Sequence, residues 1–91
     1  MMITVKIPNQ LRNVTGGASE ASVEGASTVG EVLDKLYDRF DGLRERIADD
    51  GDLRRFVNVY VQGEDIRFLE GLDTTVNDGD EVTILPAVAG G

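Results

Sequence analysis

The last two residues, Gly90 and Gly91, have the clearest chemical potential in this chain. Glycine lacks a Cβ, so a Gly-Gly end can enter a narrow channel and adopt backbone angles that other residues resist. We expect the α-carboxylate of Gly91 to be a sterically open reactive group. A carboxylate is a poor electrophile, so a partner would have to activate it, for example by adenylation. From Pro86 onward the tail extends roughly 17 Å, at about 3.4 Å per residue. The alternative is a frayed end that happens to contain glycines.

No second set of residues predicts catalysis. The sequence has no cysteine and no histidine, which removes the usual thiolate and imidazole nucleophiles, bases and metal ligands. Serine and threonine are present, but nothing in the sequence identifies a base that would activate them. The run at residues 49–52 lacks the ligand spacing of a calcium loop, and a solvated turn is expected there. We therefore expect no enzyme activity, no metal site and no bound cofactor.

The composition indicates one small acidic domain. Of the 91 residues, 41 % are hydrophobic and 29 % charged, and 17 acidic against 9 basic residues give a net charge of −8. Such a surface repels nucleic acid and anionic lipid and favours a basic protein partner, unless the acidity serves solubility alone. No apolar run is long enough to span a bilayer. The chain starts with apolar residues that alternate with polar ones, so no signal peptide is expected. A cytoplasmic protein is expected.

A hairpin and one main helix are predicted in the first half of the chain. Alternation indicates strands at residues 3–7 and 20–24, with a glycine turn between them. Thr28 and Glu31 match a helix capping box, and the apolar residues that follow recur at helical spacing up to Phe40. Gly42 is expected to stop this helix, and residues 43–47 to form a short second one.

The second half predicts three further strands. Residues 56–62 are expected to form the strongest strand, with Val57, Val59 and Val61 on one face. A short edge strand is expected at 65–68, an irregular stretch at 69–80 and a last strand at 81–85. One helix can cover only one face of a mixed sheet, so an α+β fold is expected. The order of hairpin, helix and further strands is that of the ubiquitin-like β-grasp roll, which we predict. It comprises residues 1–86, with central first and last strands, and a flexible tail at 87–91.

The C-terminal sequence then resembles a known family. Residues 78–91 resemble the C-terminal signature of the sulfur carrier proteins of the MoaD/ThiS family. Residues 55–61 and 64–68 resemble more closely its actinobacterial cysteine-synthesis carriers, the CysO group. Ile7-Pro8, Leu11-Arg12 and the Thr-Gly-Gly at 15–17 fit the same group.

The resemblance implies chemistry at Gly91 that is performed by partner enzymes. An E1-like adenylyltransferase and sulfurtransferase would adenylate Gly91 with ATP and magnesium, and sulfur would then convert its carboxylate to a thiocarboxylate. A pyridoxal-phosphate-dependent cysteine synthase would use this sulfur on O-phosphoserine, and a zinc-dependent JAMM-type peptidase would release the cysteine. The cofactors would belong to these partners, and neither nucleic acid nor membrane is expected to bind.

Two groups of residues are expected to meet the partners. Gly90, Ala89 and Val88 would thread the partner's channel, and an exposed surface would dock the body; its candidates are Phe56, Tyr60, Phe68 and Leu69. Several readings stay open: a MoaD-like subunit of molybdopterin synthase, a carrier for sulfur insertion into a secondary metabolite, a ubiquitin-like modifier joined to lysines, or a plain interaction module.

Overall fold

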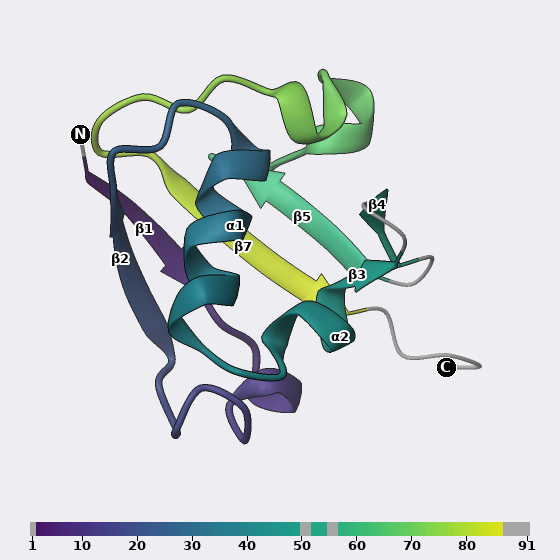
Figure 1. Ribbon diagram of the computed structural model, residues 1–91. Coiled ribbons are helices and arrows are strands. Elements are labelled where there is room, and N and C mark those ends of the chain that lie inside the picture. Colours follow the sequence, from purple (N-terminus) through teal and green to yellow (C-terminus); the bar gives the residue numbers. More distant parts are fainter. Residues whose placement is uncertain (1, 50–51, 55–56, 87–91) are drawn as a thin grey trace.

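The computed structural model describes residues 2–49, 52–54 and 57–86, and Figure 1 shows their arrangement. Five strands form one mixed sheet in the order β2-β1-β7-β5-β6, and the helix α1 crosses one face of it. The strands of this sheet are β1 (Met2–Lys6), β2 (Glu20–Glu24), β5 (Val57–Val61), β6 (Glu64–Asp65) and β7 (Glu81–Pro86). This is the β-grasp arrangement that the order of the predicted elements indicates.

The strand β7 lies in the centre of the sheet. It runs parallel to β1, with Val5 opposite Val82, and antiparallel to β5, with Val59 opposite Ile84. The predicted hairpin is formed by β1 and β2, which pair antiparallel along their full length. The predicted parallel pairing of the first and last strands is therefore confirmed.

The main helix α1 (Val29–Arg39) begins where the capping box predicts. The Thr28 Oγ1 accepts a hydrogen bond from the Glu31 N–H at 3.2 Å. The Glu31 carboxylate reaches back one residue further than expected and accepts from the Ser27 N–H at 2.7 Å. The two bonds satisfy two backbone donors at the helix start, so this end of α1 is firmly defined.

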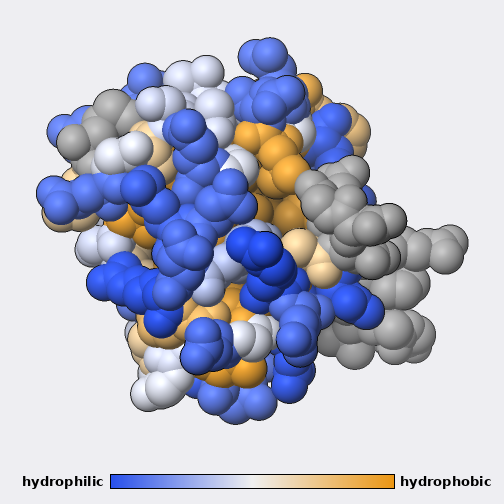
Figure 2. Space-filling model, viewed as in Figure 1, coloured by the Kyte–Doolittle hydropathy of each residue, from blue (hydrophilic) through white to orange (hydrophobic). Residues whose placement is uncertain are grey.

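One apolar core fills the space between α1 and the sheet. The inward residues of the strands and the apolar stripe of α1 meet there, as their spacings predict. Hydrophilic side chains run along the exposed side of α1, and apolar residues show beside it on the side of β5 (Figure 2). The core residues that are at most 1 % exposed are Ile3, Val5, Ala26, Val29, Val32, Leu36, Leu43, Ile47, Val59, Ile66, Val76, Val82 and Ile84.

Short elements join α1 to the strand β5. The helix ends at Arg39, earlier than predicted, and Gly42 adopts a φ of 86° at the start of α2 (Leu43–Ile47). Gly42 thus begins the second helix instead of stopping the first. After α2, β3 (Ala48–Asp49) pairs antiparallel with β4 (Asp52–Leu53), where only a solvated turn was expected.

The edge strand predicted at residues 65–68 is confirmed in kind, but its predicted extent is wrong, because β6 covers Glu64–Asp65 alone. Pairing with β5 ends at Asp65, and η2 (Ile66–Phe68) is a 3₁₀ turn. The Asp65 side chain accepts a hydrogen bond from the Arg67 N–H at 2.9 Å. This bond stabilises a turn in place of further strand pairing. A second 3₁₀ turn, η3 (Gly71–Asp73), falls in the stretch predicted to be irregular.

Candidate functional site: the root of the C-terminal tail

The strand β7 is held by neighbouring strands as far as Pro86. Its pairing with β1 runs from Glu81 to Thr83, and its pairing with β5 runs on to Pro86, which lies opposite Val57. Residue 86 is the last that the structure describes. Any group that follows in the sequence is therefore attached to a central, well-packed strand.

The predicted reactive and threading residues fall beyond this point. Gly91, Gly90, Ala89 and Val88 lie outside the described residues, as does Phe56 of the predicted docking surface. Their roles stay predictions. The described residues show how the body presents the root of the tail and which side chains surround it.

The sheet face opposite α1 carries a polar row across all five strands. Lys6 forms an ion pair with Glu20, and this hydrogen-bonded contact raises the pKa of the Lys6 ammonium. The half-buried Tyr60 stands opposite both Thr83 and Asp65. The members of this row are Glu20, Lys6, Thr83, Tyr60 and Asp65.

An apolar side chain that the sequence analysis missed lies nearer to the tail. Leu85 is 46 % exposed on the open face, directly before Pro86. Val82 and Ile84 are buried, so strict alternation along β7 places Leu85 on the outer face and was a usable signal. Leu85 is thus an exposed apolar side chain directly before the root of the tail.

A clamped arginine lies beside Leu85. Asn58 stands opposite Leu85, and its Oδ1 accepts a hydrogen bond from Arg67 Nη2 at 2.6 Å. The same Nη2 donates to Asp65 Oδ2 at 2.9 Å. Hydrogen bonds from Arg67 lower the pKa of the Asp65 carboxyl, and the same contact raises the pKa of Arg67. Arg67 is thus held in a fixed position with its charge paired.

The described members of the predicted docking surface occupy two places. Tyr60 belongs to the polar row on the sheet face. Phe68 and Leu69 lie beyond the edge strand β6, where Phe68 is 86 % exposed and Leu69 is 41 % exposed. The candidate docking residues therefore lie in two separate places, with Tyr60 on the sheet face and Phe68 and Leu69 at the sheet edge, which is called the edge contact below.

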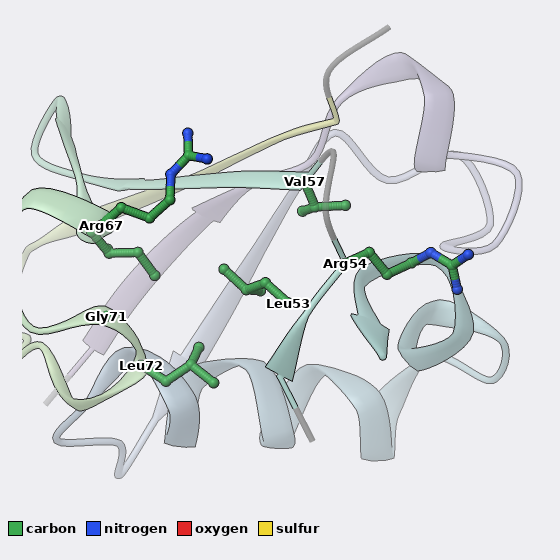
Figure 3. Close-up of a pocket in the computed structure, with 7 residues that line it drawn as sticks. Leu53, Arg54, Val57, Arg67, Gly71 and Leu72 are labelled. Carbon is green, nitrogen blue, oxygen red and sulfur yellow. The ribbon is translucent and has the colours of Figure 1, made fainter. Parts of the chain in front are cut away.

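A cavity of about 240 Å³ adjoins the edge contact on the core side of the sheet (Figure 3). Leu53 and Leu72 point into it, whereas the guanidinium groups of Arg54 and Arg67 point away. Arg54 Nη1 donates instead to the Glu45 carbonyl at 3.1 Å. Among the described residues, the lining of the hollow is mainly aliphatic and the arginine head groups turn outward, so these residues do not provide the converging polar groups of a catalytic or anion site.

The described residues contain no other candidate for chemistry. In residues 2–49, 52–54 and 57–86, no group of three or more histidine, cysteine, aspartate or glutamate side chains could hold a metal ion. Across the same ranges, no helix has the length and apolar character that crossing a membrane requires. The root of the tail and the surface beside it remain the candidate site.

Comparisons with known proteins place this chain in a family. The model of the ThiS family matches residues 5–91. The sulfur carrier protein CysO of Mycobacterium tuberculosis is 51 % identical over 94 residues, which cover 100 % of both chains. Small archaeal modifier protein 3 of Haloferax volcanii is 42 % identical over 69 residues, covering 76 % of this chain and 75 % of that protein.

A solved structure agrees with the sequence comparisons. A chain in the crystal structure of the Amycolatopsis orientalis BexX/CysO complex matches with a TM-score of 0.90 and 48 % identity, covering 98 % of this chain and 99 % of that one. The β-grasp fold and the resemblance to the sulfur carriers are thereby confirmed. The relatives also confirm the expectation of a carrier, not an enzyme. The chain belongs to the ThiS family and is a sulfur carrier protein of the ThiS/MoaD/CysO type.

Proposed function

We propose that this protein carries sulfur as a thiocarboxylate on Gly91 and delivers it to cysteine biosynthesis in the cytoplasm. The observation that carries the proposal is the 51 % identity to CysO over the full length of both chains. The geometry supports it, because the tail leaves a central strand that is paired as far as Pro86. A partner can then draw in the tail while the body stays folded.

The proposed chemistry needs activation before sulfur transfer. The Gly91 carboxylate attacks the α-phosphate of ATP on an E1-like enzyme, pyrophosphate leaves, and an acyl adenylate forms. A sulfur donor displaces AMP and leaves the thiocarboxylate. Magnesium accompanies ATP on that enzyme, and this chain supplies the acyl group alone.

Delivery of the sulfur proceeds on a second enzyme. In a cysteine synthase-like partner that uses pyridoxal phosphate, O-phosphoserine would lose phosphate, and the thiocarboxylate sulfur of this chain would bond to the serine β-carbon. The amine of the new cysteine lies within reach of the thioester carbon and attacks it, so the adduct rearranges to an amide. A zinc-dependent JAMM-type peptidase then hydrolyses that amide and releases cysteine.

The body docks through the surface around the tail root. Leu85 and Tyr60 provide the sheet-face part of this surface, and Phe68 and Leu69 provide the edge part. Phe56, which lies outside the described residues, is proposed to join it. Threading of Val88, Ala89 and Gly90 would bring Gly91 into the partner's active site.

Intact-protein mass spectrometry tests the first step. Incubation with an E1-like enzyme, ATP, magnesium and a sulfide source should exchange one oxygen of the chain for one sulfur. Deletion of Gly91 should abolish the exchange and leave the circular dichroism spectrum unchanged. A chain with one alanine added after Gly91 is the matched control, because it keeps both glycines but moves the carboxylate. Equal sulfur loading of the deleted chain would disprove the assignment of Gly91.

The second step distinguishes the pathways. The thiocarboxylate, mixed with O-phosphoserine and a pyridoxal-phosphate synthase, should give a carrier that bears one cysteine in a linkage resistant to hydroxylamine. Dithiolene formation with a molybdopterin-synthase large subunit, without a cysteine adduct, would favour the MoaD-like alternative. Similarity to the archaeal modifier favours a second candidate, a ubiquitin-like modifier, and Gly91 amides on lysines of other proteins would identify it. Failure of all three with competent partners would favour sulfur insertion into a secondary metabolite.

A further inference from the structure

The exposure of Phe68 is imposed by a rigid turn. Phe68 is 86 % exposed, whereas Ile66, two residues earlier, is 1 % exposed and packs in the core. The Asp65 carboxylate accepts the Arg67 N–H at 2.9 Å, and the Leu69 N–H donates to the Ile66 carbonyl at 3.0 Å. Since these bonds and the buried isoleucine fix η2, the phenyl ring is presented to solvent by the fold itself.

The turn is connected to the root of the tail. The Arg67 side chain extends from η2 to Asn58 on β5, at 2.6 Å between Nη2 and Oδ1. Asn58 is the cross-strand neighbour of Leu85, and the tail begins immediately after that strand. An enzyme bound over Leu85 would therefore lie next to Asn58 and Arg67, and Arg67 directly precedes Phe68.

The surroundings of Phe68 are acidic. Glu64 lies before the turn, and Glu70 and Asp73 follow it, all three with exposed side chains. The charge of Arg67 is paired with Asp65, and no lysine or arginine follows Arg67 in the sequence. The segment thus presents one exposed aromatic side chain with three exposed acidic side chains close to it in sequence.

We infer that Phe68 is the anchor by which the enzyme that adenylates Gly91 recognises this carrier, and that it enters an apolar recess with a basic rim on that enzyme. The inference rests on the proposed function and adds the chemistry of the partner. Aromatic side chains at the centre of an interface commonly dominate its affinity, and complementary charge increases the association rate. A second copy of this chain is the poorer occupant, because each copy has a net charge of −8.

The test measures initial rates of adenylation against carrier concentration with the purified enzyme that loads the wild-type chain. Phe68→Ala should raise the KM about tenfold, as expected for an interface hot spot, and leave kcat unchanged because the tail is intact. Met2→Ala is the matched control. Met2 is 44 % exposed, but it lies at the start of β1, and the parallel pairing with β7 places it at the sheet end opposite the tail.

A charge variant tests the rim separately. Glu70→Lys should slow association at low salt, and its difference from the wild type should shrink as salt rises, because screening weakens exposed charges. Phe68→Ala should keep the salt dependence of the wild type. Both side chains are exposed, so the two variants are expected to melt close to the wild-type temperature.

The outcomes separate the two proposals. If the wild type is loaded and Phe68→Ala has an unchanged KM, the anchor is disproved and the carrier function stands. If competent enzymes load neither chain, the proposed function fails and the anchor fails with it. Concentration-dependent dimerisation that Phe68→Ala abolishes would assign the turn to a second copy and overturn the inference.

Discussion

Neighbouring residues on β7 should separate stability from partner binding. Ile84 is 1 % exposed and stands opposite Val59, which is 0 % exposed, so Ile84 belongs to the core. Leu85 follows on the other face and is 46 % exposed. Ile84→Val and Leu85→Ala alter the same strand next to the same tail, but on opposite sides of the sheet.

Ile84→Val is expected to affect stability, and Leu85→Ala is expected to affect mainly the binding of the partner. Ile84→Val removes one buried methylene and should cost about 1 kcal/mol, which lowers the melting temperature of a domain this size by about 4–8 °C. Leu85→Ala removes more atoms, but about half of that surface already touches water, so it should cost about 1 kcal/mol or less in stability. Loss of about 1 kcal/mol of docking energy would raise the KM for adenylation about fivefold.

The assay pairs thermal melts followed by circular dichroism with loading kinetics at 25 °C. Ile84→Val should melt lower and load with wild-type KM, because a small domain keeps several kcal/mol of stability after losing one. Leu85→Ala should melt no lower than Ile84→Val and show the higher KM. If Ile84→Val raised the KM more than Leu85→Ala, the assignment of the two faces to stability and docking would be refuted.

Three further predictions concern the helix and the tail. Thr28→Ala should lower the free energy of unfolding by about 1 kcal/mol in urea titrations, whereas Thr28→Ser should restore it, because the hydroxyl accepts the Glu31 N–H. Burial, with a smaller contribution from Asp34, raises the pKa of Tyr37 to about 12, so the neutral ring stabilises the fold below pH 10 and this stability is lost as the pH rises from 10 to 12. Over that window the urea midpoint should fall further for the wild type than for Tyr37→Phe, and parallel curves would contradict the shift. Gly90→Val should melt like the wild type but adenylate poorly; normal turnover would exclude steric threading as the role of Gly90.

The sequence predicted the elements whose patterns are governed by burial. Alternation placed Val57, Val59 and Val61 in the core, and all three are at most 7 % exposed. The helix start at Thr28 followed from a local hydrogen-bonding motif, which needs no tertiary information. The central position of β7 followed from the order of the elements, because one hairpin and one helix leave few ways to close a mixed sheet.

The prediction failed where a side chain competes with the backbone ladder. The Asp65 carboxylate accepts hydrogen bonds from the Arg67 N–H and the Arg67 guanidinium, so the predicted strand ends at Asp65 and a turn follows. This change matters for the site, because it places Phe68 outside the sheet. The exposed position of Leu85 is a different case, because the same alternation along β7 that places Val82 and Ile84 in the core also turns Leu85 outward.

The central position of β7 explains why this fold suits a carrier that works through its tail. A partner that draws the tail into its active site pulls on the last strand of the carrier. An edge strand has pairing on one side alone, but β7 is paired with β5 as far as Pro86 and with β1 as far as Thr83. Two ladders and the buried Val82 and Ile84 must therefore be disrupted before β7 can separate. Under the proposed function, this attachment would let the tail be modified and passed between enzymes without loss of the fold that those enzymes recognise.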